Sequence, residues 1–230
     1  MKIIWTVLLS LASTFEVLAQ GYVSFANTPI TRISTNGVLQ APAPAGSWYY
    51  ALLVAPSTQN IIDTNSSHAF DAWTFVGLAS NTPGVSGRLN GNTTTDGVGI
   101  PVPGFGTPAT CDFVVVGWSA NIGSNWNAIR AGFGGYDPYG NLLANWQIVD
   151  PTKPGGYSYY WFGISSVAQD ILLAPLGGPY NSVFGFAGGG QIPGMDLRFP
   201  TPEPSALALL GVLTLAVSTF RGFKRESSGV

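Results

Sequence analysis

Glutamate is absent between residues 20 and 200, and the same span holds one lysine, one histidine and one cysteine. Its five basic and eight acidic residues leave a net charge near −3, and neither sign is clustered. Without a basic stripe, nucleic-acid binding is not expected. A zinc site needs three or four ligands, which one histidine and one cysteine do not supply. No cofactor is therefore expected.

The residues that common enzymatic mechanisms require are equally scarce. A Ser-His-Asp triad would depend on His68, which lies in a polar loop as a solvated residue, and no Gly-x-Ser-x-Gly elbow occurs. Glycosidases place two carboxylates across the scissile bond, and no aspartate pair is singled out by its spacing. A Walker A sequence is absent, as is a Gly-x-Gly-x-x-Gly turn after a strand. These absences predict a protein that is not an enzyme.

Cys111 is the only cysteine, so no disulfide can form within the chain. It directly precedes an apolar run at residues 113–116. Because free cysteine behaves as a small apolar residue, we expect a buried structural thiol here.

The composition favours strands and turns, since Asn, Ser, Thr, Gln and Gly must solvate the surface. Two runs, 48–54 and 113–118, are apolar on both faces, which predicts strands in the middle of a sheet that is covered on both sides. One short helix is predicted at residues 125–131, with Ser124 as its cap and with Trp126 and Ile129 facing inward. Strands are predicted at residues 22–26, 48–55, 73–78, 113–119, 157–164 and 170–174, with a weaker one at 183–186.

Long loops are predicted between these strands, at residues 56–72, 79–111 and 132–156. No repeat of fixed period emerges. The predicted fold is all-β: an antiparallel β-sandwich, with a jelly roll as one form of it, that carries one short helix.

Two ligand-binding alternatives remain for this domain. In the first, Asp63, Asn65, Ser67 and Asp71 imitate the oxygen ligands of a calcium loop, although His68 stands where such loops need glycine. In the second, polysaccharide rings stack on exposed aromatic side chains, for which the candidates are Trp146, Tyr159 and Trp161. The competing interpretation of these rings is that they fill the core.

The N-terminus has the pattern of a secretory signal peptide. Lys2 supplies the positive charge, residues 3–15 are mostly apolar, and Val17 and Ala19 are small residues before a cut. Thirteen residues are too few to span a bilayer. We therefore predict a signal peptide at residues 1–19 that signal peptidase removes between Ala19 and Gln20.

The C-terminus combines three features in order. Pro202, Glu203 and Pro204 belong to an extended, proline-rich linker at residues 199–204. An apolar run of 16 residues follows at 205–220, which as a helix is roughly 24 Å long at about 1.5 Å per residue. A basic tail at 221–230 then starts with Arg221, Lys224 and Arg225, which predicts a membrane stop with the tail on the cytoplasmic side.

This order at residues 201–225 resembles the PEP-CTERM sorting signal of exported bacterial proteins. The resemblance implies an exosortase-type membrane protease that cuts near Pro202, Glu203 and Pro204. The start at residues 21–27 also resembles exported PEP-CTERM proteins of Verrucomicrobia-like bacteria. The expectation is a non-enzymatic protein of the envelope or extracellular matrix, with residues 20–198 as the exported domain. The protein would be exported across the inner membrane and held there transiently by a membrane anchor. It would then be located in the outer envelope or outside the cell.

Overall fold

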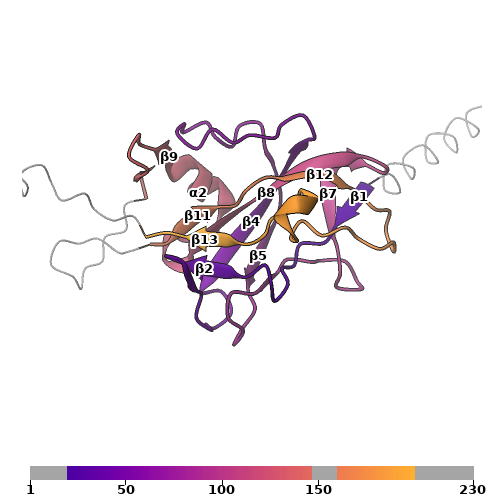
Figure 1. Cartoon of the computed structure of the whole chain (residues 1–230), viewed down its shortest axis with the longest axis horizontal. Coiled ribbons are helices and arrows are strands. Elements are labelled where there is room, and N and C mark those ends of the chain that lie inside the picture. The colour runs from indigo at the N-terminus through magenta and orange to yellow at the C-terminus, as the bar shows by residue number, and fades with distance from the viewer. Residues whose placement is uncertain (1–19, 147–159, 200–230) are drawn as a thin grey trace, which may run out of the picture. The chain divides into compact units, whose positions relative to one another are not determined.

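A computed structural model describes residues 20–146 and 160–199 (Figure 1). The predicted signal peptide, the Pro-Glu-Pro motif with the apolar run and basic tail, and the candidate Tyr159 lie outside the described residues. Among the residues that are described, no helix is long and apolar enough to cross a membrane.

The fold is built on a six-stranded antiparallel sheet. Its two central strands, β4 (Trp48–Pro56) and β8 (Thr110–Ser119), pair along their whole length, from Trp48 opposite Ser119 to Pro56 opposite Cys111 (Figure 1). On the far side of β4 lie β5 (Thr74–Asn81) and then β6 (Leu89–Asn90). On the far side of β8 lie β11 (Phe162–Ile164) and β12 (Ala168–Leu172).

Both faces of the central sheet are covered, as the two apolar runs predicted. Along β4, Tyr50, Leu52 and Val54 belong to one apolar cluster, here the first core, while the alternate residues Ala51 and Leu53 belong to another, the second core. All five side chains are fully buried. A strand that is apolar at every position is therefore explained by its having no solvent-facing side.

Short strands cover the first core. One pair is β1 (Gln20–Val23) with β7 (Ile100–Gly106), and a second group is β3 (Val38–Leu39), β2 (Ile33–Thr35) and β13 (Met195–Leu197). The β2–β13 pairing is parallel, whereas the other pairings between the described strands are antiparallel. These strands contribute Val23, Ile33, Val102 and Leu197 to the first core.

The second core lies beneath α2 (Trp126–Gly132), the hairpin of β9 (Phe133–Tyr136) and β10 (Leu142–Ala144), and the loop that joins β4 to β5. Phe70 from that loop packs its ring against Trp126 and Phe133, at centroid distances of 5.3 and 5.1 Å. Two 3-10 turns, η1 (Ala120–Ile122) and η2 (Ala187–Gly189), complete the described elements.

The predicted helix is confirmed, but its cap is one residue further along than predicted. Asn125, not Ser124, caps α2, because its side chain accepts hydrogen bonds from the backbone N–H groups of Asn127 and Ala128. Trp126 and Ile129 are buried, as expected.

The all-β class is confirmed, whereas two of the three predicted long loops are wrong. Residues 79–111 contain the end of β5 together with β6 and β7, and the described part of 132–156 contains β9 and β10. The loop between β4 and β5 is confirmed. The predicted strand at 183–186 is reduced to an isolated bridge between Phe184 and Ile192.

One buried side chain ties the N-terminal segment to the loop after β5. The amide nitrogen of Asn27 donates to the carbonyls of Thr31 and Gly87, at 3.0 and 2.8 Å. Its amide oxygen accepts from Arg88 Nε and from the N–H of Leu89, at 3.1 and 2.9 Å. All of its hydrogen-bonding capacity is directed at four different groups, so the side chain fixes several segments at once.

Candidate functional site

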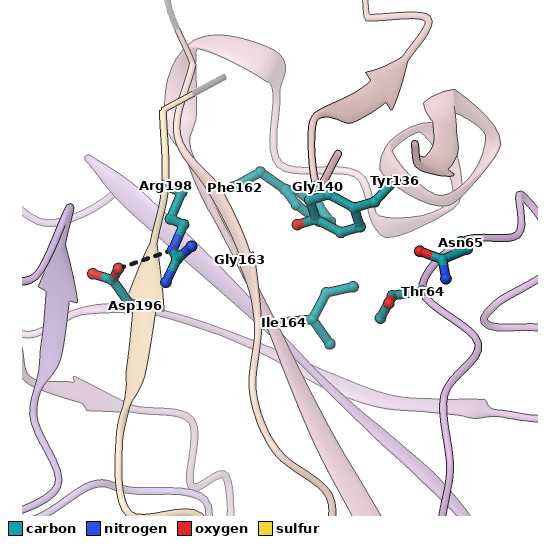
Figure 2. A pocket seen from close by; sticks show the side chains of 9 residues that line it. All are labelled: Thr64, Asn65, Tyr136, Gly140, Phe162, Gly163, Ile164, Asp196 and Arg198. Carbon is teal, nitrogen blue, oxygen red and sulfur yellow. Dashed lines mark hydrogen bonds and ion pairs between the residues drawn. The ribbon is translucent and has the colours of Figure 1, made fainter. Parts of the chain in front are cut away.

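A groove with a volume of about 420 Å³ opens at the edge of the second core (Figure 2). Four segments line it. The β4–β5 loop contributes Thr64 and Asn65, and the β9–β10 hairpin contributes Tyr136 and Gly140. The strand β11 contributes Phe162, Gly163 and Ile164, and the segment at β13 contributes Asp196 and Arg198. We call this cavity the Tyr136 groove.

A close backbone approach holds the β4–β5 loop against β9. The N–H of Tyr136 donates to the carbonyl of Thr64 at 2.8 Å. The preceding residue, Gly135, has a φ of 87°, and a Cβ there would lie 2.8 Å from the carbonyl oxygen of Asn65. Glycine is required at 135 both by its backbone angle and by this contact.

A second close approach holds the end of β13 against β11. Phe162 and Arg198 exchange two backbone hydrogen bonds, of 3.0 and 2.8 Å. Next to this pair, a Cβ on Gly163 would clash with the carbonyl oxygen of Asp196. The close packing of β11 against β13 in this wall of the groove therefore requires a residue without a side chain at position 163.

The charged pair in the lining is satisfied internally. Asp196 accepts from Ser34 Oγ at 2.6 Å, from the N–H of Gly37 at 2.9 Å and from Arg198 Nε at 3.4 Å. Burial raises the pKa of Asp196, but these hydrogen bonds outweigh it, so that the pKa lies below its usual range. Asp196 is therefore a carboxylate at neutral pH, and it offsets the charge of Arg198.

Three neutral polar side chains face the groove without a partner. Within residues 20–146 and 160–199, the hydroxyls of Thr64 and Tyr136 and the side-chain amide of Asn65 make no hydrogen bond with the protein. Burial raises the pKa of Tyr136 to about 12, against the opposing influence of the Arg198 charge. Its phenol is protonated at neutral pH and available as a donor.

The predicted aromatic candidates do not form one platform. Trp146 packs with the second core, against Tyr160 and Phe162 at centroid distances of 5.4 and 5.1 Å, and its Nε1 donates to the carbonyl of Ile129. Trp161 packs with the first core, against Trp48 at 6.3 Å. Because the two cores lie on opposite faces of the central sheet, these two indoles are not part of a shared stacking strip.

The predicted calcium loop uses its carboxylates for other contacts. Asp63 accepts from the backbone N–H of Asn65 at 3.1 Å. Asp71 accepts from Arg130 at 2.6 Å and pairs with His68 at 2.9 Å, and these partners lower its pKa. In the part of the chain that the structure describes, no three His, Cys, Asp or Glu side chains gather in a metal-binding group. Calcium binding through Asp63, Asn65, Ser67 and Asp71 stays a prediction.

His68 and Cys111 both occupy the environments predicted for them. The His68 side chain is 81% exposed on the loop surface. Cys111 is completely buried in the first core. Burial, and to a smaller extent the nearby charge of Asp112, raise the pKa of Cys111 to about 11. The thiol is therefore un-ionised and inert at neutral pH.

Sequence reasoning did not find the Tyr136 groove. Tyr136 precedes Asp137 and Pro138, and this sequence predicts only a turn. Arg198 follows a three-residue strand whose sequence does not predict a strand. Nothing in the local sequence indicates that residues 64, 136, 163 and 198 meet.

No protein-family model, no curated protein and no solved structure matches the chain.

Proposed function

We propose that the chain is an exported, non-enzymatic protein of the bacterial envelope or extracellular matrix, sorted by a PEP-CTERM-like C-terminal signal. Its partners in this proposal are signal peptidase at Ala19 and Gln20, and an exosortase-type membrane protease at Pro202, Glu203 and Pro204. Arg221, Lys224 and Arg225 act as the membrane stop. The mature protein would be released to the outer envelope or the extracellular space.

The observation that carries the proposal is the order of sequence features at the C-terminus: Pro202, Glu203 and Pro204 come first, then the apolar run at 205–220, then the basic residues. β13 ends at Leu197, and the compact unit Met1–Phe199 ends before Pro202. A cut near Pro202, Glu203 and Pro204 would therefore leave β13 whole.

The finer fold belongs to the same proposal. The central sheet and the short strands over the first core would form the two layers of a β-sandwich, with α2 as an addition on the other face. Residues 1–19 and 205–220 would form the signal helix and the transmembrane helix.

The alternative is a carbohydrate-binding module that stacks sugars on exposed aromatic rings. It has less support, because Trp146 and Trp161 lie on opposite faces of the central sheet and each packs against other rings. Tyr159 is outside the described residues.

The intact mass of the mature protein from its native host tests the proposal. We expect the mass of a chain that starts at Gln20 and lacks residues 207–220. A mature protein that still contains residues 207–220 would contradict exosortase-type processing, and a simple single-pass anchor would then describe it better. A mass that includes residues 1–19 would contradict the predicted signal peptide.

A further inference from the structure

We propose that the Tyr136 groove binds one ring of a neutral sugar, such as a terminal residue of a polysaccharide. This inference concerns residues that the sorting signal does not use, and it holds whether or not the C-terminus is cleaved. It also differs from stacking on Trp146 or Trp161, because here the ligand enters a cavity.

The size and walls of the groove suit a small ring. Its volume of about 420 Å³ falls within the range of roughly 300–1,000 Å³ that is typical of small-molecule sites. Figure 2 shows the Tyr136 ring and the Ile164 side chain on opposite sides of the cavity, with Thr64 and Asn65 toward one end and Arg198 toward the other. The C–H face of a pyranose can pack against an aromatic ring while its rim stays polar.

The polar groups that face the groove match sugar hydroxyls. A hydroxyl both donates and accepts, and the free groups of Thr64, Asn65 and Tyr136 include two hydroxyls and one amide with both functions. In Figure 2 the Tyr136 hydroxyl points toward the Arg198 end, so the polar groups are spread around the cavity. A ring with several hydroxyls could satisfy them together.

The charges in the lining argue against an anionic ligand. Among the described residues that line the groove, Arg198 is the only cation, and Asp196 pairs with it at 3.4 Å. Phosphate sites normally offer an unmatched arginine or lysine, or backbone N–H groups at a helix N-terminus. With one positive and one negative charge, this lining favours a neutral ligand.

The backbone around the groove is already positioned. The hydrogen bond between Tyr136 and Thr64 joins two of the four lining segments, and the paired bonds between Phe162 and Arg198 join the other two. A preformed site loses little ordering entropy when a ligand binds.

Saturation-transfer NMR and calorimetry on the purified full-length chain test the inference, in a detergent without a sugar headgroup. The probes are glucose, galactose, mannose and N-acetylglucosamine, each as a monosaccharide and as a short oligomer, with glucuronate as the anionic comparison. Asn65→Ala and Tyr136→Phe each remove one polar group from the groove. Asn60→Ala and Tyr139→Phe are matched controls, since Asn60 and Tyr139 are exposed and do not line it.

We expect at least one neutral sugar to bind, the two groove variants to weaken its binding at least tenfold, and the controls to match the wild type. Thermal unfolding of each variant confirms that the fold is retained. Three results would overturn the inference: no binding by any neutral probe, tighter binding of glucuronate, or binding that survives both groove variants. If only the Trp161→Ala variant lost binding, the sugar would be binding on an exposed aromatic ring and not in the groove.

Discussion

The backbone N–H of Asp170 donates a 2.8 Å hydrogen bond to Oδ1 of Asp112, across the pairing of β12 with β8. Asp170 has a φ of 53° and lies where the register of β12 shifts, between Ala168 and Ile171. Asp112 is fully buried, and among the described residues its Oδ2 has no hydrogen-bond partner. Burial raises the pKa of Asp112, the Asp170 hydrogen bond opposes this, and the Asp170 charge adds to it.

Asp112 should make the free energy of unfolding depend on pH. Because its folded-state pKa lies above the unfolded value of about 3.9, the folded protein holds the proton more tightly. The resulting stabilisation is complete below pH 3.9 and is lost as the pH rises through the folded-state pKa, by about 1.4 kcal/mol for each unit of difference. Relative to Asp112→Asn, the wild type should therefore lose stability as the pH rises from 3 to 7 in urea unfolding.

Asp96→Asn provides the control of opposite sign. Hydrogen bonds from Thr94 and the N–H of Val98 lower the pKa of the exposed Asp96. The stability that this group contributes is present above its unfolded pKa and is lost as the pH falls. Relative to Asp96→Asn, the wild type should therefore gain a little stability as the pH rises, the opposite of the change expected for Asp112. A difference between the wild type and Asp112→Asn that does not change with pH would contradict the first prediction.

Asn27→Asp should destabilise the fold by about 3 kcal/mol or more. The substitution replaces the amide that donates to the carbonyls of Thr31 and Gly87 with a carboxylate oxygen, which leaves both carbonyls facing a negative charge. Urea unfolding at pH 7 measures the loss, and Asn60→Asp, at an exposed position, should stay within about 0.5 kcal/mol of the wild type. Equal stability of the two variants would show that the buried network is not maintained.

Gly163→Ala should lower the free energy of unfolding by about 1–3 kcal/mol, since the new methyl would clash with the backbone oxygen of Asp196 and must displace β13. Gly188→Ala is the matched control: no atom lies within 4 Å of its Cβ position, and its φ is not positive. We expect the control to change the thermal midpoint by no more than a degree or two in either direction. If Gly163→Ala unfolds at the same temperature as the control, β11 and β13 do not pack as closely as described.

The triple change Pro202→Ala, Glu203→Ala and Pro204→Ala should leave export intact but stop release from the membrane. The signal peptide that drives translocation is untouched, and the apolar run with its basic stop is retained. Fractionation of the native host, followed by intact-mass analysis, should find a membrane-bound form that still carries the C-terminal segment. Normal release of this variant would remove the role assigned to the tripeptide.

Charge reversal of Arg221, Lys224 and Arg225 to Glu is the comparison for this experiment. It should act through a different mechanism, because it weakens the charge bias that keeps the tail cytoplasmic. Protease accessibility of the tail would then show slipped or inverted orientation, while the triple-Ala variant keeps the wild-type orientation.

Much of the central sheet could be predicted from the sequence, because its strands are long and their burial is written into consecutive residues. The apolar runs of β4 and β8 predict central strands without knowledge of any partner, and both are confirmed. α2 could be predicted because a polar cap and two inward apolar residues are all local features. The buried thiol of Cys111 follows from the same run.

The peripheral strands could not be predicted in the same way. β7 contains Pro101, Pro103, Gly104 and Gly106, a composition that indicates a turn, yet it pairs with β1 at the margin of the fold. Proline is tolerated there because an edge strand does not need every N–H for its partner. β2, β3 and β13 have two or three residues each and become strands only through pairing with one another.

By itself, the sequence determined the central sheet, the helix and the terminal patterns that underlie the proposed sorting, since each depends on residues that are neighbours in the chain. Only the tertiary structure decided that Asp112 is buried beside Asp170, that Trp146 and Trp161 face opposite cores, and that Thr64, Tyr136, Gly163 and Arg198 line one groove. These arrangements join residues that are tens of positions apart. Their free energy comes from contacts that exist only when the whole chain is packed, and no local pattern encodes them.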